Sequence, residues 1–153
     1  MSQFIDTDIT LLLTKLDTLS DEKSPLWGKM TAQQMVEHLT DSLKISSGKI
    51  KLPLETPEEK LPKMLQFLES EHAMPRSFEV SFVDPKAQLR HDEMALAIDE
   101  FLLEWIDFED YFSNPAASET VHPLYGALNY EQWLRLHSKH FTHHFTQFEL
   151  IET

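Results

Sequence analysis

The amino-acid sequence predicts an all-α fold, a bundle of four helices joined by one long crossover. Four stretches of the chain carry apolar residues three and four positions apart, the spacing that places side chains on one face of an α-helix. The three glycines, Gly28, Gly48 and Gly126, each stand beside a stretch typical of an element boundary. A single six-residue stretch alternates like a strand, which gives an all-β fold little support.

The first two predicted helices are defined by their apolar stripes and their ends. The first carries apolar residues from Ile5 to Leu19 and is ended by the sequence SDEKSP. The second is predicted to follow Thr31, because Gln34 stands three positions later and the two residues fit a capping box. This helix runs through Ile45, after which the sequence SSGK closes it.

The crossover is predicted over residues 46 to about 85, a stretch that holds five of the eight prolines. Within it, the sequence EEKLPKMLQFLESE is compatible with a short helix that has Pro62 near its first turn. The alternating stretch FEVSFV, residues 78–83, has no visible partner strand to satisfy its backbone. We therefore predict an extended connection there, packed on the bundle.

The last two helices have the clearest patterns. From Met94 to Phe112 large apolar residues recur every three or four positions, which predicts a core helix. The acidic residues on its other faces are typical of a solvated surface. The final helix is predicted to follow Asn129, a suitable N-cap residue, and to continue to Phe148.

Composition and charge limit the class of protein. A chain of 153 residues with 41% hydrophobic residues is about one domain long, so we expect a single domain over residues 1–153. The formal net charge of −13 opposes binding to nucleic acid. Because the sequence shows neither a signal peptide nor a membrane span, we expect a cytoplasmic protein with no membrane partner. With no cysteine, any metal must be bound through nitrogen or oxygen.

The last helix carries four histidines within eight residues: His137, His140, His143 and His144. At about 100° per residue, His140 and His144 lie roughly 40° and one turn apart, so both imidazoles can reach one ion. His143 falls outside the inner stripe and is expected to be a bystander. His137 shares the stripe, as a rival third ligand or as a group that orients the site.

A third ligand must come from another helix, and His38 meets this requirement. It lies between Met35 and Ser42, at the edge of the apolar stripe of the second helix. We therefore predict that His38, His140 and His144 bind one divalent metal ion. Three neutral imidazoles plus solvent leave a coordination position open, as in catalytic zinc sites. A polar network or a solvated, histidine-rich helix end would explain the pair on the last helix equally well.

The remaining histidines have other expected roles. His72 and His91 stand in loop-like or helix-start contexts, where we expect exposure. His122 precedes Pro123 in the turn sequence HPLYG. It either caps the mouth of the site or satisfies the backbone groups of that turn.

Three segments of the chain resemble the DinB/YfiT-like superfamily of proposed metalloenzymes: WGKMTAQQMVEHLTDSLK, HPLYGALNYEQW and KHFTHHFTQF. Together they cover about a quarter of the chain. The matching ligand positions of this superfamily are His38, His140 and His144, followed by Gln147. The resemblance implies an up-and-down four-helix bundle with a long crossover, a three-histidine site for nickel, zinc or a similar divalent ion, and a homodimer.

The predicted function is that of a metal-dependent enzyme, a hydrolase or a thiol transferase acting on an unknown small molecule. In this hypothesis the ion activates a water or a thiol nucleophile. The alternative is a non-catalytic ligand-binding or interaction bundle with incidental or no metal, and a purely structural site would be closed by a fourth ligand such as His137. No general base is identified, and the near candidates by sequence are Glu37, Asp41, His122 and His137. Four large apolar residues are either pocket walls or, more commonly for such residues, core: Trp27, Met30, Trp105 and Tyr125.

Overall fold

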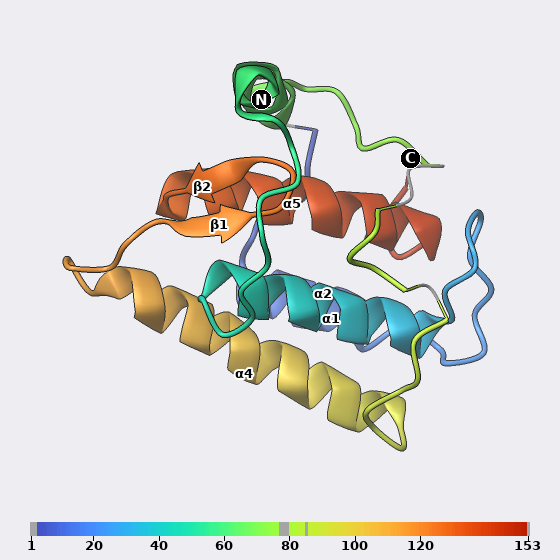
Figure 1. Ribbon diagram of the computed structural model, residues 1–153. Coiled ribbons are helices and arrows are strands. Elements are labelled where there is room, and N and C mark those ends of the chain that lie inside the picture. The colour runs from blue at the N-terminus through green and yellow to red at the C-terminus, as the bar shows by residue number, and fades with distance from the viewer. Residues whose placement is uncertain (1–2, 77–79, 85, 153) are drawn as a thin grey trace.

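The computed structural model describes residues 3–76, 80–84 and 86–152, and these residues are mostly helical (Figure 1). They form five α-helices: α1 (Ile9–Leu16), α2 (Ala32–Ser46), α3 (Leu61–Glu69), α4 (Met94–Ser113) and α5 (Tyr130–Gln147). A 3-10 turn, η1 (Glu58–Lys60), precedes α3, and a hairpin of β1 (Thr120–His122) and β2 (Gly126–Leu128) precedes α5. The prediction of a mostly helical fold is confirmed. Among these helices, none has the length and apolar character needed to cross a membrane.

Capping boxes set the first residues of the two helices that carry the candidate ligands. At α2, Thr31 Oγ1 accepts from the Gln34 N–H at 3.1 Å, and Gln34 Oε1 accepts from the Thr31 N–H at 2.8 Å. Asn129 and Gln132 repeat this exchange at α5, with both bonds at 2.9 Å. The predicted caps at Thr31 and Asn129 are therefore confirmed, and they set where each helix begins.

Helix α1 is shorter than predicted. It begins after Asp8, whose carboxylate accepts from the Leu11 N–H at 3.1 Å, and it ends at Leu16. Ile5 lies outside the helix, because its N–H donates to Thr142 Oγ1 of α5 at 2.7 Å. The apolar residues before Asp8 thus pack along α5 instead of extending α1.

Helices α2 and α4 lie side by side and run in the same direction, whereas α5 runs the opposite way (Figure 1). Two ion pairs are consistent with the parallel arrangement: Lys44 to Glu100 at 3.0 Å and, further along both segments, Lys49 to Glu104 at 2.7 Å. The long connection between α2 and α4 returns the chain to the end at which α2 began. The helix directions therefore do not alternate strictly along the chain.

The long connection is attached to α5 through α3. Arg135 Nε donates to the Leu68 carbonyl at 3.1 Å, and the Lys139 ammonium donates to the Phe67 carbonyl. Two cations thus satisfy the carbonyl end of α3, where the helix dipole favours positive charge. Of the predicted extended stretch, residues 78 and 79 lie outside the described part. Residues 80–83 include a turn in which the Val83 N–H is bonded to the Val80 carbonyl at 3.3 Å.

The hairpin was not expected from the sequence. Its strands pair Thr120 with Leu128 and His122 with Gly126. Gly126 has φ +84°, and a Cβ added there would lie 3.3 Å from a methyl carbon of Leu61. The Thr120 hydroxyl donates to the Ser46 carbonyl at 2.8 Å. The hairpin therefore ties the end of α2 to the start of α5.

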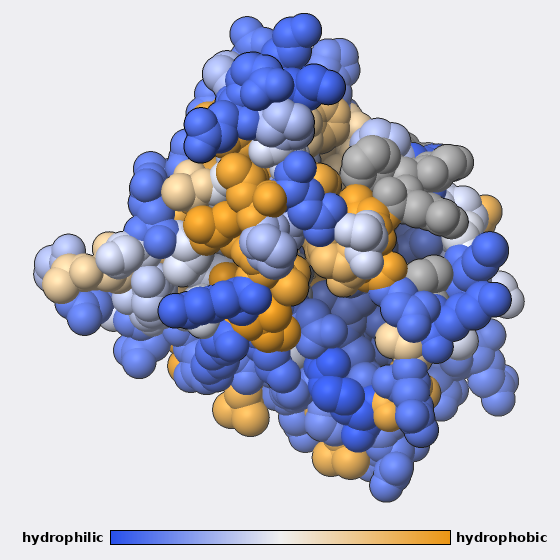
Figure 2. All heavy atoms as spheres, in the orientation of Figure 1, coloured by the Kyte–Doolittle hydropathy of each residue, from blue (hydrophilic) through white to orange (hydrophobic). Residues whose placement is uncertain are grey.

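One hydrophobic core lies between α1, α2, α4 and α5, with buried residues from all four helices. Its aromatic part includes Phe101 of α4 against Phe141 of α5, with ring centroids 5.6 Å apart. On the face shown in Figure 2, hydrophobic side chains gather between α3 and α2, and hydrophilic side chains dominate around them. The candidate site lies where α2 and α5 face each other across this core.

Candidate metal centre

Helices α2 and α5 bring together the three predicted ligands. His38 Nε2 lies 2.8 Å from His140 Nε2, which lies 3.1 Å from His144 Nε2. One ring nitrogen from each residue lies within 4.8 Å of the other two. Zinc–nitrogen bonds of about 2.0–2.1 Å in a tetrahedron separate neighbouring ligand nitrogens by about 3.4 Å. The separations of 2.8 and 3.1 Å are shorter than this, and all three nitrogens lie within 4.8 Å of one another, so the group could hold one metal ion after a small adjustment of the rings.

All three imidazoles are neutral near pH 7. Burial lowers the pKa of His38 from 6.5 to about 4, with a smaller contribution from His143. Burial is also the main cause that holds the pKa values of His140 and His144 well below 6.5, followed by repulsion between the neighbouring rings. Neutral imidazole is the form that binds metals, so the site needs no proton release near pH 7.

Gln147 fixes the orientation of His144. Its amide nitrogen donates to the Trp27 carbonyl at 2.9 Å, so its amide oxygen faces His144 Nδ1 at 2.7 Å. An amide oxygen can only accept, which places the ring proton on Nδ1. His144 Nε2 therefore carries a lone pair directed toward the group. This is the usual way in which an outer hydrogen bond orients a metal-binding histidine.

The loop before α2 is shaped around the same glutamine. The Leu26 N–H donates to the Gln147 carbonyl at 2.8 Å. Gly28 has φ +83°, and a Cβ added there would lie 2.9 Å from the Gln147 amide nitrogen. A larger residue at position 28 would thus be strained and would press on the group that orients His144.

The donor set suits a cation better than it suits a hydrogen-bonded network. His140 Nε2 has two neighbours, and a single proton on it can be directed at only one of them. A divalent ion, by contrast, accepts the lone pairs of all three nitrogens at once. Within the ranges that the structure describes, no carboxylate or fourth imidazole joins the group.

His137 lies outside this group, although it shares the stripe of α5. Its Nε2 is 2.9 Å from the Ser46 hydroxyl, and its ring packs against Phe108, Trp133 and Phe141. Its Nδ1 is buried without a hydrogen-bond partner. Burial, with a smaller contribution from His122, lowers its pKa to about 3. The structure thus places the rival third ligand in the aromatic core.

Two more histidines, His143 and His122, do not join the group. The ring of His143 lies 5.2 Å from that of Trp27, and burial lowers its pKa. His122 Nδ1 accepts from the Leu124 N–H at 3.0 Å, so it satisfies the backbone of its turn. Burial lowers the pKa of His122 to about 4.

The last two histidines lie further away. His72 is exposed, as expected. His91 is partly buried, contrary to expectation, because its Nε2 lies 3.1 Å from a Glu100 oxygen.

The acidic candidates for a general base hold the chain together instead. Buried Glu37 accepts from the Arg90 N–H at 2.7 Å and from Gln33 Nε2 at 3.0 Å. Asp41 pairs with the Arg90 guanidinium at 3.0 Å. Both carboxylates thus fasten the segment before α4 onto α2.

The four candidate wall residues divide between core and surface. Trp105 and Tyr125 are buried in the core, and Met30 is partly buried against it. Trp27 instead lines a cavity on the outer side of α5, together with Arg76 and Lys139. Sequence reasoning missed both cations. The one feature that could have drawn attention to Lys139 is its position among the buried residues of α5.

Fold and site together define a mostly helical protein with a three-histidine group that could hold a metal ion. Residues 4–150 match the family described as "Protein of unknown function (DUF1569)", and the chain belongs to this family. No curated protein and no solved structure matches the chain. The function is therefore argued from the site itself.

Proposed function

We propose that this protein is a metal-dependent enzyme in which His38, His140 and His144 hold one divalent ion, with nickel and zinc the foremost candidates. The observation that carries this proposal is the convergence of three neutral ring nitrogens from two helices within 4.8 Å. Three-imidazole sets are typical of catalytic metal sites, which keep a position for solvent or substrate.

The proposed reaction is hydrolysis or thiol transfer on a small molecule. A bound divalent ion would lower the pKa of a water or a thiol and so supply a nucleophile near neutral pH. The chain contributes binding and orientation, through His38 and His140, which are intermediate in exposure, and through His144. His144 is buried and held by Gln147, which keeps its ring directed at the group.

The resemblance to the DinB/YfiT-like superfamily supports the same proposal. Helices α1, α2, α4 and α5 would be its four bundle helices, and the chain between α2 and α4 its long crossover. The superfamily likeness also suggests a homodimer, and a cytoplasmic location is proposed from the sequence. The net charge of −13 argues against nucleic acid as a partner, and no membrane partner is proposed.

Elemental analysis of tag-free protein tests the proposal, with wild type compared to His144→Ala and to His143→Ala as a matched neighbour outside the group. We expect about one ion per chain in wild type and in His143→Ala, and close to none in His144→Ala. The ion should also be lost as the pH falls far enough to protonate imidazole. Circular dichroism checks that each variant is folded.

A folded wild type that takes up no metal, even after reconstitution with nickel or zinc, would overturn the proposal. It would favour the alternative of a non-catalytic binding bundle. If metal is bound, a screen of hydrolase and thiol-transfer substrates with wild type and His38→Ala tests the enzymatic part.

A further inference from the structure

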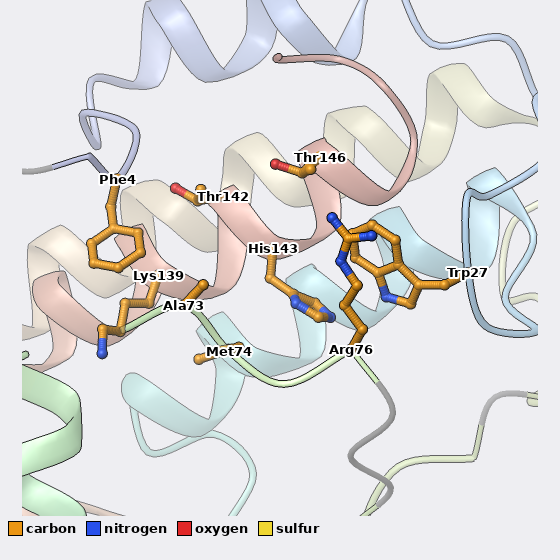
Figure 3. A pocket seen from close by; sticks show the side chains of 9 residues that line it. All are labelled: Phe4, Trp27, Ala73, Met74, Arg76, Lys139, Thr142, His143 and Thr146. Carbon is orange, nitrogen blue, oxygen red and sulfur yellow. The ribbon is translucent and has the colours of Figure 1, made fainter. Parts of the chain in front are cut away.

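A cavity of about 80 Å³ lies against the face of α5 that carries Lys139, Thr142 and His143 (Figure 3). Three segments close over α5 to form it: the chain before α1, the loop before α2 and the residues after α3. They contribute Phe4, Trp27 and Arg76, respectively, and α5 itself contributes Lys139 and His143. Figure 3 shows Phe4 and Lys139 at one end, with Trp27, Arg76 and His143 at the other.

The cavity is cationic in a strongly acidic protein. The net charge of the chain is −13, yet none of the residues that line this cavity is Asp or Glu. The Arg76 guanidinium lies over the Trp27 ring, 4.1 Å from its centroid. Among the residues placed by the structure, no carboxylate forms an ion pair with Arg76. Its planar donors are therefore available to an anion.

Trp27 provides an aromatic wall at the same end of the cavity. Its indole nitrogen is buried and has no hydrogen-bond partner. Figure 3 shows this nitrogen on the side of the ring toward His143. Because this nitrogen is closed off from the cavity, the Trp27 ring contributes its aromatic surface, against which Arg76 lies, and not a donor.

Lys139 adds positive charge without being a free donor. Its ammonium is bonded to the Phe67 carbonyl and lies 3.4 Å from the Ser70 hydroxyl. Burial, followed by repulsion from Arg135, lowers its pKa to about 8, so it remains mostly charged at pH 7. Its field favours an anion in the cavity.

We propose that this cavity binds the carboxylate or phosphate head of a small organic acid, with the Arg76 guanidinium as its donor. A cavity of about 80 Å³ suits one small head group. The aromatic rings of Phe4 and Trp27 accommodate an apolar group attached to that head. The site does not depend on the metal, because His143 separates the cavity from His144.

Calorimetric titration of the full-length protein tests the inference, with benzoate and phenyl phosphate as acidic probes and benzamide as a neutral one. We expect one saturable site for at least one acid and none for benzamide. The preferred probe distinguishes a carboxylate from a phosphate ligand. Arg76→Gln should weaken binding at least about tenfold, because it removes the charged guanidinium group. Lys63→Gln, an exposed change of equal charge on α3, should leave binding unchanged.

The titration is repeated after chelation and with His38→Ala, since acids can also bind a metal directly. Binding that persists in both cases supports the separate site. Failure of both acids to saturate the protein would overturn the inference. Equal binding of benzamide, equal binding by Arg76→Gln, or loss of binding on chelation would overturn it as well. None of these outcomes depends on whether the three-histidine group holds an ion.

Discussion

Two places on α5, about one turn apart, carry the same residue type in opposite surroundings. His140 and His144 direct ring nitrogens at His38 of α2. His137 instead faces Ser46 of α2 and is enclosed by aromatic rings. Both places are buried enough to keep their imidazoles neutral near pH 7.

The difference originates in the facing helix. Because α2 and α5 run in opposite directions, a step back along α5 from His140 to His137 is a step forward along α2 from His38 to Ser46. His38 on α2 completes a cluster of ligand atoms with the histidines of α5, whereas Ser46 on α2 makes a single hydrogen bond with His137. Helical spacing therefore shows which residues point inward, and the partner helix determines what they can bind.

The largest expected effect is on stability, at the enclosed histidine. His137→Ala removes a ring packed between aromatic side chains and should lower the free energy of unfolding by about 2–4 kcal/mol. His137→Phe keeps the ring volume and should cost much less. Urea unfolding measures both, and elemental analysis should find the metal content of the Phe variant unchanged. A loss of metal in His137→Phe would contradict the separation of His137 from the three-histidine group, because it would show that His137 supports metal binding.

The next effect concerns the support of the ligand group. Gln147→Leu removes the acceptor that orients His144 and should weaken metal binding about 10- to 100-fold. Competition with a metal-binding dye measures the change in dissociation constant. Unchanged affinity in this variant would show that packing alone orients His144.

The pH dependence of stability should isolate the contribution of His137. His137 stays neutral in the folded protein down to about pH 3, whereas the unfolded chain binds a proton near pH 6.5. The unfolded state thus holds more protons between these values, and stability falls as the pH falls through this window. The contribution of His137 is about 1.4 kcal/mol per pH unit. Unfolding of chelator-treated protein at pH 7 and pH 5 should show a smaller decrease for His137→Phe than for wild type.

The smallest expected effect is at the partner of His137. Ser46→Ala removes one buried hydrogen bond and should lower the free energy of unfolding by about 1 kcal/mol. Metal affinity should not change in Ser46→Ala, whereas it should fall in Gln147→Leu. A parallel loss of metal affinity would mean that the two places are coupled along α5.

The sequence was most informative where local rules operate. Thr31 and Asn129 were recognisable as caps because each satisfies backbone groups within three residues of itself. The placement of His140 and His144 on one face follows from helix geometry alone. His38 was a correct choice of neighbour because its helix shows a clear inner stripe.

Features that depend on distant partners were not predictable. His91 is partly buried because Glu100 and Glu37 hold its segment, and no local pattern signals this. The strands at Thr120–His122 and Gly126–Leu128 are three residues each, too short for an alternation to be visible. The stacking of Arg76 on Trp27 joins residues from two separate loops.

The arrangement of α2 against α5 has a consequence for the order of folding. His38 and His140 are 102 positions apart in the chain, so their contact forms only after a long loop has closed. Local elements such as the hairpin and the individual helices can form earlier. An ion that needs all three imidazoles would bind only the completed native state and would stabilise it by mass action. Metal uptake after dilution from denaturant would then report the final step of assembly.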